Sequence, residues 1–144
     1  MQTFMPYPDF EQSAKVLDRQ RLGCQRKECL QILKALSNPT YGWQNHPVVK
    51  MWRGYELLLI EYGLTICKEW TERGYKDTCG DKIAGYVYAE MLNDPELKLN
   101  LPWLNDEFCS RHRAALLAKN YEWYSQFGWT EKPEIDYIYP IDKR

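Results

Sequence analysis

Apolar side chains recur every three or four residues along most of this chain, and no stretch shows the two-residue alternation typical of a strand. Four segments carry this helical spacing: residues 11–36, 45–73, 77–92 and 105–124. Residues that disfavour helices separate them, among them Pro39, Gly74 and Pro95. The pattern predicts an all-α protein, a single compact helical domain of three to four main helices over residues 1–144. An irregular aromatic tail is expected at its C-terminal end.

The ends of the expected helices carry recognisable signals. The second segment opens with Asn45-His46-Pro47, in which Asn45 or His46 would cap the helix and Pro47 would lie in its first turn. Gly74 is expected to end the same helix. Asn105 precedes two acidic residues, a combination that favours a helix start.

Length and composition restrict the class of protein. The chain has 144 residues and a mass of 17.2 kDa, enough for one domain with its own hydrophobic core. No apolar run is long enough for a membrane span, and the polar start MQTFMPYPDF is not typical of a signal peptide. We therefore expect a cytoplasmic protein that does not bind membranes.

The cysteines and histidines indicate neither disulfides nor a metal site. The five cysteines lack any CxxC pair and are expected to be reduced thiols; they are Cys24, Cys29, Cys67, Cys79 and Cys109. Only two histidines occur, and neither lies near a second plausible ligand in the sequence. We expect no metal and no cofactor.

The net charge conceals an uneven distribution. The chain has 19 Lys and Arg against 20 Asp and Glu, for a net charge of −1, which argues against a uniformly basic nucleic-acid binder. However, residues 12–36 carry a net charge of +4 and residues 108–119 a net charge of +3, so the rest of the chain carries −8. Packed side by side, the two basic segments would bind DNA phosphates. The alternative is that they are ordinary solvated helix faces.

Aromatic residues make up 15% of the chain. Trp43 and the cluster over residues 121–129 could offer rings on which bases stack. Most of these rings are more simply explained as core, because a small helical domain needs large side chains to fill it. We expect a stacking role for one or two of them at most.

Glu28 is an isolated acid in the first basic segment. On a helical wheel it shares a stripe with Arg21, Cys24 and Gln25, and neighbouring cations would keep it ionised. Glu28 could be a member of a helix ion pair, contributing about 0.3–0.5 kcal/mol. Alternatively, it is a carboxylate at the edge of a DNA groove that stabilises developing positive charge or moves a proton.

Several motifs, taken in order, resemble one enzyme family. The run VLDRQRLGCQRKE at residues 16–28, the Asn45-His46-Pro47 helix start and the run ERGY at residues 72–75 are similar to the pyrimidine dimer DNA glycosylases. Residues 110–119 and the aromatic cluster that follows fit the last helix of that family. The resemblance implies a DNA-repair glycosylase with abasic-site lyase activity, which excises UV-induced pyrimidine dimers from double-stranded DNA without a metal.

The resemblance also implies a set of catalytic residues. In that family the α-amino group at the chain start attacks C1′ of the damaged nucleotide, forms a Schiff base and allows β-elimination of the strand. An α-amino group titrates close to neutral pH, which leaves a useful unprotonated fraction. The catalytic glutamate of the family falls on Glu28. The prototype exposes a small hydroxylated residue, whereas here Gln2 follows Met1, so either the Met1 amine serves, processing is unusual, or lyase chemistry is weaker or absent.

Charge and resemblance together predict a DNA-binding surface. A kinked duplex would lie across the two basic segments, with the chain start and Glu28 at its centre. We expect a monomer whose DNA-binding residues are Arg19, Arg21, Arg26, Lys27, His46, Arg111, Arg113 and Lys119. Three other readings stay open: a glycosylase of the same fold for another damaged or modified base, a non-catalytic DNA-binding module, and a helical interaction protein.

Overall fold

The computed structural model describes residues 1–87, 98 and 100–141, and within them the chain forms helices and no strand. This confirms the predicted all-α class. The helices are α1 (Phe10–Val16), α2 (Arg19–Ser37), α3 (Pro47–Trp52), α4 (Glu56–Glu72), α5 (Gly80–Ala84), α7 (Asp106–Lys119) and α8 (Tyr121–Tyr124), with a 3₁₀ turn at Ser125–Phe127.

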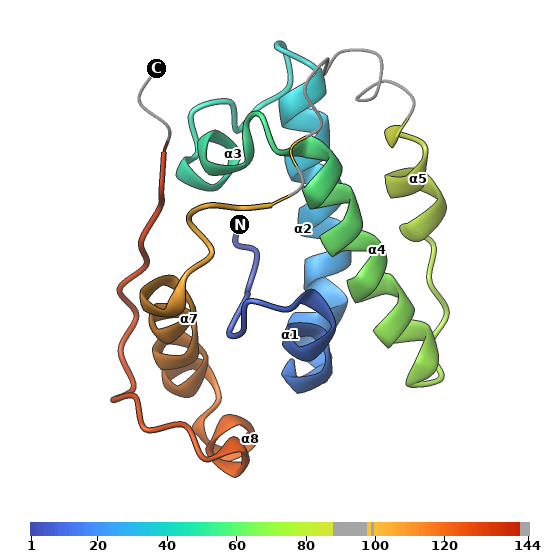
Figure 1. The fold of residues 1–144 in the computed structure, drawn as a ribbon. Coiled ribbons are helices and arrows are strands. Elements are labelled where there is room, and N and C mark those ends of the chain that lie inside the picture. The colour runs from blue at the N-terminus through green and yellow to red at the C-terminus, as the bar shows by residue number, and fades with distance from the viewer. Residues whose placement is uncertain (88–97, 99, 142–144) are drawn as a thin grey trace.

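Helices α2 and α4 pack against each other, and α1 and α5 both lie against α4 (Figure 1). Helix α7 stands apart from this group, with the start of the chain between α7 and α2. After the 3₁₀ turn that follows α8, residues 128–141 run back along the outer side of α7 without helix or strand, as the sequence predicts for the aromatic tail. The arrangement therefore encloses the chain start between helices.

The close contact of α2 with α4 depends on a glycine. A Cβ at Gly63 of α4 would lie 2.4 Å from Sγ of Cys29 on α2, which is too close for any side chain. Cys29 is fully buried, and its thiol lies 3.5 Å from the carbonyl oxygen of Leu59. All five cysteines are unbridged, as predicted, and Cys24 alone is exposed.

The expected helix over residues 11–36 is two helices, so the prediction of one continuous helix is wrong. Leu17 has an extended backbone, with φ −66° and ψ 135°, and Asp18 then begins α2. The backbone N–H of Asp18 donates to the hydroxyl oxygen of Tyr124 at 3.0 Å, and the Tyr124 hydroxyl donates to the Asp18 carboxylate. A residue of α8, distant in sequence, thus fixes the break.

The expected helix over residues 45–73 is also divided, into α3 and α4. Gly54 lies between them with φ +92°, a conformation that side chains other than glycine rarely adopt. The predicted ends are confirmed: the His46 side chain accepts from the backbone N–H of Val48 at 3.1 Å, and Pro47 is the first residue of α3. At the other end, α4 stops at Glu72, just before Gly74 with φ +96°.

In the last expected helix, the predicted start is confirmed and a break that the sequence did not predict divides it. Asn105 caps α7 by accepting from the backbone N–H of Phe108 at 3.0 Å, as predicted. The expected helix to residue 124 breaks at Asn120, whose side chain caps α8. Helix α5 ends at Ala84, so it is shorter than expected within the described residues. The predicted continuation to residue 92, with its stop at residues 93–95, lies outside them.

Among the residues that the structure describes, no helix is both long and apolar enough to cross a membrane.

Candidate active site

The first residues of the chain are buried, although chain ends are commonly solvated and poorly ordered. Gln2 is 6% exposed and Phe4 5%, while Thr3 and Met5 are fully buried. Met1, just before them, is half-buried. The chain start is therefore part of the core, with its terminal residue at the surface of that core.

Helices α3 and α4 hold this segment through buried polar side chains. The indole N–H of Trp52 donates to Oγ1 of Thr3 at 3.0 Å. The hydroxyl of Tyr62 lies 2.8 Å from the carbonyl oxygen of Phe4. Both aromatic side chains are fully buried, so these contacts fix the segment from its first residues onward.

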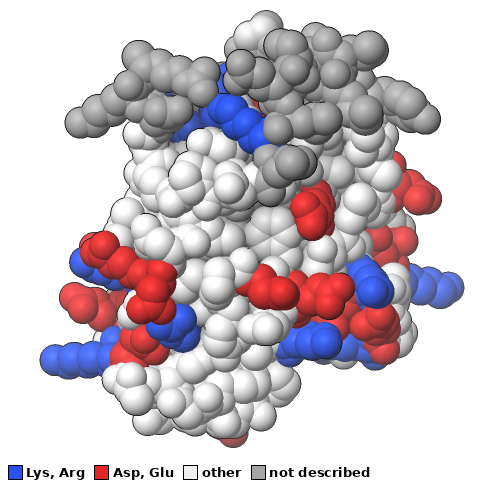
Figure 2. Space-filling model, in the orientation of Figure 1, with Lys and Arg blue, Asp and Glu red and all other residues white. Residues whose placement is uncertain are grey.

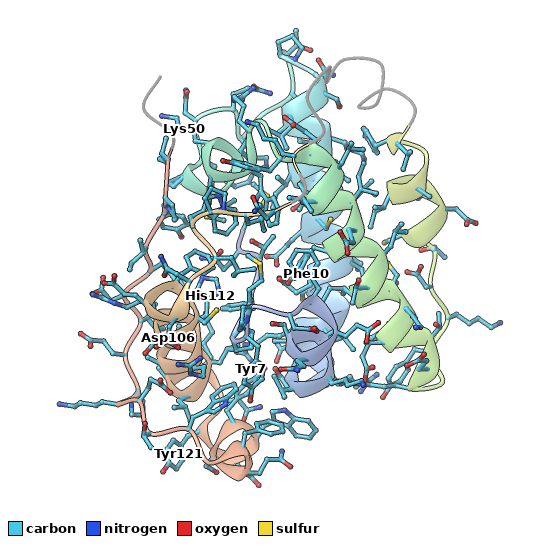
Figure 3. The ribbon with its side chains drawn as sticks, in the orientation of Figure 1. Tyr7, Phe10, Lys50, Asp106, His112 and Tyr121 are labelled. Carbon is cyan, nitrogen blue, oxygen red and sulfur yellow. The ribbon has the colours of Figure 1, made fainter. Side chains whose placement is uncertain are left out.

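Helix α7 holds the next two residues. Nδ1 of His112 accepts from the backbone N–H of Met5 at 2.9 Å, and Figure 3 shows His112 on the side of α7 that faces the chain start. Arg113 donates to the carbonyl oxygen of Pro6 at 2.8 Å. His112 is fully buried, and burial lowers its pKa to about 3, so it is neutral at physiological pH.

Gln25 of α2 connects the chain start to Glu28. Its side-chain N–H groups donate to the carbonyl oxygen of Gln2 at 2.8 Å and to the Glu28 carboxylate at 2.5 Å. Its amide oxygen accepts from the backbone N–H of Phe4 at 2.7 Å and lies 2.7 Å from the Tyr62 hydroxyl. This buried amide uses its full hydrogen-bonding capacity. Sequence reasoning named Gln25 only as a neighbour of Glu28, because nothing local in the pattern indicates its partners.

Glu28 is electrostatically linked to the chain start. Burial raises the pKa of its carboxyl above the ordinary value, and three influences oppose this: the positive charge of the terminal amine, the hydrogen bond from Gln25 and the charge of Lys119. The ion pairs of α2 in the described residues are made by Arg21 and Arg26. The arrangement favours a carboxylate placed near the amine over a member of a helix ion pair.

His46 lies near the same amine. Partial burial lowers its pKa, and the positive charge at the chain start lowers it further. Since Nδ1 accepts from Val48, the neutral ring carries its proton on Nε2. The terminal amine, Glu28 and His46 are therefore the candidate site, with residues from the chain start, the middle of α2 and the start of α3.

Two of the predicted DNA-binding arginines, Arg26 and Arg113, have several partners within the protein. Arg26 is 8% exposed, lies 2.6 Å from an Asp77 carboxylate oxygen and stacks 4.4 Å from the centre of the Trp70 ring. Arg113 pairs with Glu131 at 3.0 Å in addition to holding the chain start. Both guanidinium groups thus pair with acids within the protein, and a phosphate would compete with those acids.

The other predicted cations differ in their pairing. Arg21 pairs with Asp18 at 3.0 Å, and Arg111 pairs with Asp136. By contrast, Arg19, Lys27 and Lys119 are exposed, and none of them has an ion pair among residues 1–87, 98 and 100–141. On the face shown in Figure 2, acidic and basic side chains are intermingled. Four of the seven predicted lysines and arginines thus have acid partners within the protein.

A surface pocket lies along the first turns of α2. It is lined by Arg19, Cys24 and Lys27 of that helix and by the rings of Trp70 and Trp123. The lining of this pocket does not include Gln25 or Glu28, whose side chains bond toward the chain start. In the described part of the chain, no group of three or more His, Cys, Asp or Glu side chains could hold a metal ion.

Comparison with known proteins identifies the family. No curated protein and no solved structure matches the chain. A family model described as pyrimidine dimer DNA glycosylase matches residues 1–83, which is more than half of the chain. The matched span contains the buried chain start, Gln25, Glu28 and His46. The residues that come together at the chain start thus lie within the part shared with a family of DNA glycosylases, and the chain belongs to the pyrimidine dimer DNA glycosylase family.

Proposed function

We propose that this enzyme excises UV-induced pyrimidine dimers from double-stranded DNA and then cleaves the abasic strand, with the α-amino group at the chain start as nucleophile. The observation that carries the proposal is the Gln25 amide, which bonds both the Gln2 carbonyl and the Glu28 carboxylate. One buried side chain thereby fixes the chain start relative to a carboxylate whose pKa the terminal amine lowers.

The chemistry assigns a distinct role to each group. The unprotonated amine attacks C1′ of the damaged nucleotide, and the electron pair of the breaking glycosidic bond leaves with the base. The carboxylate of Glu28 stabilises the positive charge that develops on the sugar and accepts a proton from the attacking amine. The nitrogen lone pair then forms the C1′=N bond of the Schiff base as the C1′–O4′ bond breaks, and O4′ takes up a proton. Loss of a C2′ proton then expels the 3′ phosphate by β-elimination.

Met1 rather than Gln2 is the proposed source of the amine. Met1 is half-buried, whereas Gln2 is buried, its carbonyl oxygen is bound by Gln25, and its side-chain oxygen accepts from the backbone N–H of Thr3 at 2.9 Å. The terminal residue is partly exposed, and the second residue is part of the packing. Intact-mass spectrometry of the protein tests whether Met1 is present.

The proposed DNA surface uses the cations that have no acid partner in the described residues. Arg19, Lys27 and Lys119 would bind backbone phosphates, and the Nε2–H of His46 would donate to a phosphate or sugar oxygen near the reacting nucleotide. Extrusion of a nucleotide from the duplex costs a few kcal/mol, which such contacts offset. This surface replaces the wider groove expected from the two basic segments.

Trapping with borohydride tests the mechanism. The protein is incubated with UV-irradiated duplex or with abasic duplex in the presence of borohydride, which reduces a Schiff base to a stable covalent adduct. We expect adducts with both substrates. An adduct with abasic DNA alone would indicate that another lesion is recognised, and no adduct with either would contradict the lyase mechanism.

Substitution of Glu28 tests the role of the carboxylate. We expect Glu28→Gln to abolish base release while largely preserving DNA binding, because the amide still accepts from Gln25 but cannot stabilise a cation. The matched control is Glu61→Gln, which removes an exposed carboxylate from α4. Turnover by Glu28→Gln equal to that of Glu61→Gln would remove Glu28 from the mechanism.

A further inference from the structure

Trp43, in the loop before α3, has an unusual conformation for a large side chain. Its φ is +74°, the single positive value at a residue other than glycine within the described residues. A bulky L-residue is disfavoured in the left-handed region because its Cβ crowds the backbone. The indole is also 55% exposed, so packing of this ring in the core does not explain the conformation.

Hydrogen bonds hold the loop around Trp43 in place. The backbone N–H of His46 donates to the carbonyl oxygen of Trp43 at 2.9 Å. The side chain of Gln44 donates to the carbonyl oxygens of Ala35 and Asn38, at 2.5 and 2.7 Å. A backbone strain that persists because its surroundings impose it is typical of functional sites. The loop thus presents an indole to solvent in a fixed orientation.

The indole lies beside the proposed site. The edge of the Trp43 ring meets the His46 ring, with 5.8 Å between ring centres and 68° between planes. The pKa of His46 is lowered in part by the amine at the chain start. The exposed indole therefore contacts His46, a residue of the candidate site.

The surroundings of the indole suit a base better than a protein partner. Its neighbours in the sequence, Gly42, Gln44 and Asn45, carry no apolar side chain that would extend the indole into a larger apolar surface of the kind that a protein partner covers. A nucleobase presents a flat π-face to which one indole is sufficient, and stacking of this kind tolerates any base sequence.

We propose that Trp43 stacks on a DNA base next to the reacting nucleotide. When that nucleotide leaves the duplex stack, its neighbour loses a stacking partner, and the indole covers the exposed face. The inference rests on the proposed function, since it places the reacting nucleotide at the chain start. It assigns base stacking to this loop, whereas the basic surface binds phosphates.

A fluorescence experiment tests the stacking directly and needs no turnover. The duplex contains a non-cleavable tetrahydrofuran abasic analogue with 2-aminopurine at the adjacent position, and stacking on the indole quenches the 2-aminopurine. Wild type is compared with Trp43→Ala, Trp43→Phe and Leu64→Ala, the last removing an apolar side chain that is 36% exposed on α4. Circular dichroism verifies that each variant is folded, and anisotropy gives its affinity for damaged and undamaged duplex.

We expect Trp43→Ala to lose the quenching and to bind the abasic duplex about tenfold more weakly, with about twofold change or less on undamaged duplex. Trp43→Phe should retain part of both effects, and Leu64→Ala should match wild type. Quenching and affinity of Trp43→Ala equal to those of wild type would overturn the inference.

Base release from a dimer-containing duplex separates this inference from the proposed function. If wild type releases no base while its quenching depends on Trp43, the excision of dimers is contradicted and the stacking role stands. If wild type is active and Trp43→Ala equals it in rate, quenching and affinity, the stacking role alone is contradicted.

Discussion

At the scale of single residues, the hydrogen bond from Gln25 to Glu28 influences the pKa of the Glu28 carboxyl. The Gln25 side chain donates to the carboxylate at 2.5 Å, and this bond counteracts the rise in the Glu28 pKa that burial causes. A glutamate at position 25 would have nearly the same shape but no N–H to donate. It would also place a second carboxylate beside the first, a pair in which one pKa rises strongly.

Gln25→Glu is therefore expected to slow base release and to move the acid limb of its pH–rate profile upward by about one unit or more. The sign follows from the proposed mechanism, in which Glu28 acts when ionised: a higher pKa of its carboxyl removes the ionised form at a higher pH. Single-turnover base release measured across pH provides the test, and affinity for the duplex should change by about twofold or less.

The matched control for this charge change is Gln12→Glu, which alters an exposed residue of α1. It introduces the same negative charge away from the buried amide and should leave the profile in place. If Gln25→Glu keeps the wild-type rate and acid limb, Gln25 does not position the site, and its hydrogen bonds are solely structural.

At the scale of elements, helix ends are predictable from the sequence where their signals are local. The His46-Pro47 start of α3 and the Asn105 cap of α7 each involve groups within three residues of one another. The break between α1 and α2 is not predictable in this way, because Tyr124 of α8 supplies the hydroxyl that binds Asp18.

The residues of the candidate site divide in the same way, into those with a local signal in the sequence and those that depend on distant partners. Glu28 and His46 were predicted through the motifs around them, and their roles stay predictions. Gln25 and His112 were not predicted as site residues, because their importance depends on partners at the chain start that lie 21 and 107 residues away. A basic segment likewise indicates positive charge but not the acids that neutralise it, as with Arg26 and Asp77.

The attachment of the chain start to α7 is expected to make stability depend on pH. His112 has a pKa of about 3 in the folded protein, and a histidine in the unfolded chain titrates near the ordinary value of 6.5. Between these values the unfolded chain binds the additional proton, so the free energy of unfolding falls as pH decreases below about 6.5. The contribution from His112 approaches about 1.4 kcal/mol per pH unit.

His112→Leu tests this attachment by urea unfolding at pH 7 and pH 5. At pH 7 the variant should be less stable by about 1–3 kcal/mol or more, because the buried N–H of Met5 loses its acceptor. At pH 5 its deficit relative to wild type should be smaller by about 2 kcal/mol, because only the wild type has His112 to protonate. His46 is present in both proteins and cancels in the comparison. A deficit that is equal at both pH values would contradict a buried neutral His112.

At the scale of the whole molecule, ion pairs within the protein reduce the charge that DNA can neutralise. Seven lysines and arginines were predicted to bind DNA, and four of them have acid partners: Arg21, Arg26, Arg111 and Arg113. A phosphate that displaces such a partner exchanges one anion for another, so little net attraction is gained. We therefore expect Arg19, Lys27 and Lys119 to determine most of the electrostatic contribution to DNA binding.

The salt dependence of DNA binding measures how many lysines and arginines neutralise DNA phosphates. Each neutralised phosphate contributes about −0.9 to the slope of the logarithm of the binding constant against the logarithm of the salt concentration. Three cations predict a slope of about −3, whereas all seven would give about −6. We expect the shallower value on undamaged duplex, and Lys119→Met should reduce its magnitude by about 1.

Lys68→Met is the matched control, since Lys68 lies on α4 and pairs with Glu72 at 4.0 Å. Its slope should equal that of wild type. A wild-type slope near −6 would mean that the arginines exchange their acid partners for phosphates, and Arg111→Met would then reduce it as strongly as Lys119→Met. A slope near −3 that Lys119→Met leaves unchanged would instead place the DNA away from the C-terminal end of α7. Because Lys119 lowers the pKa of Glu28, that result would also separate the phosphate-binding surface from the carboxylate proposed to act on the sugar.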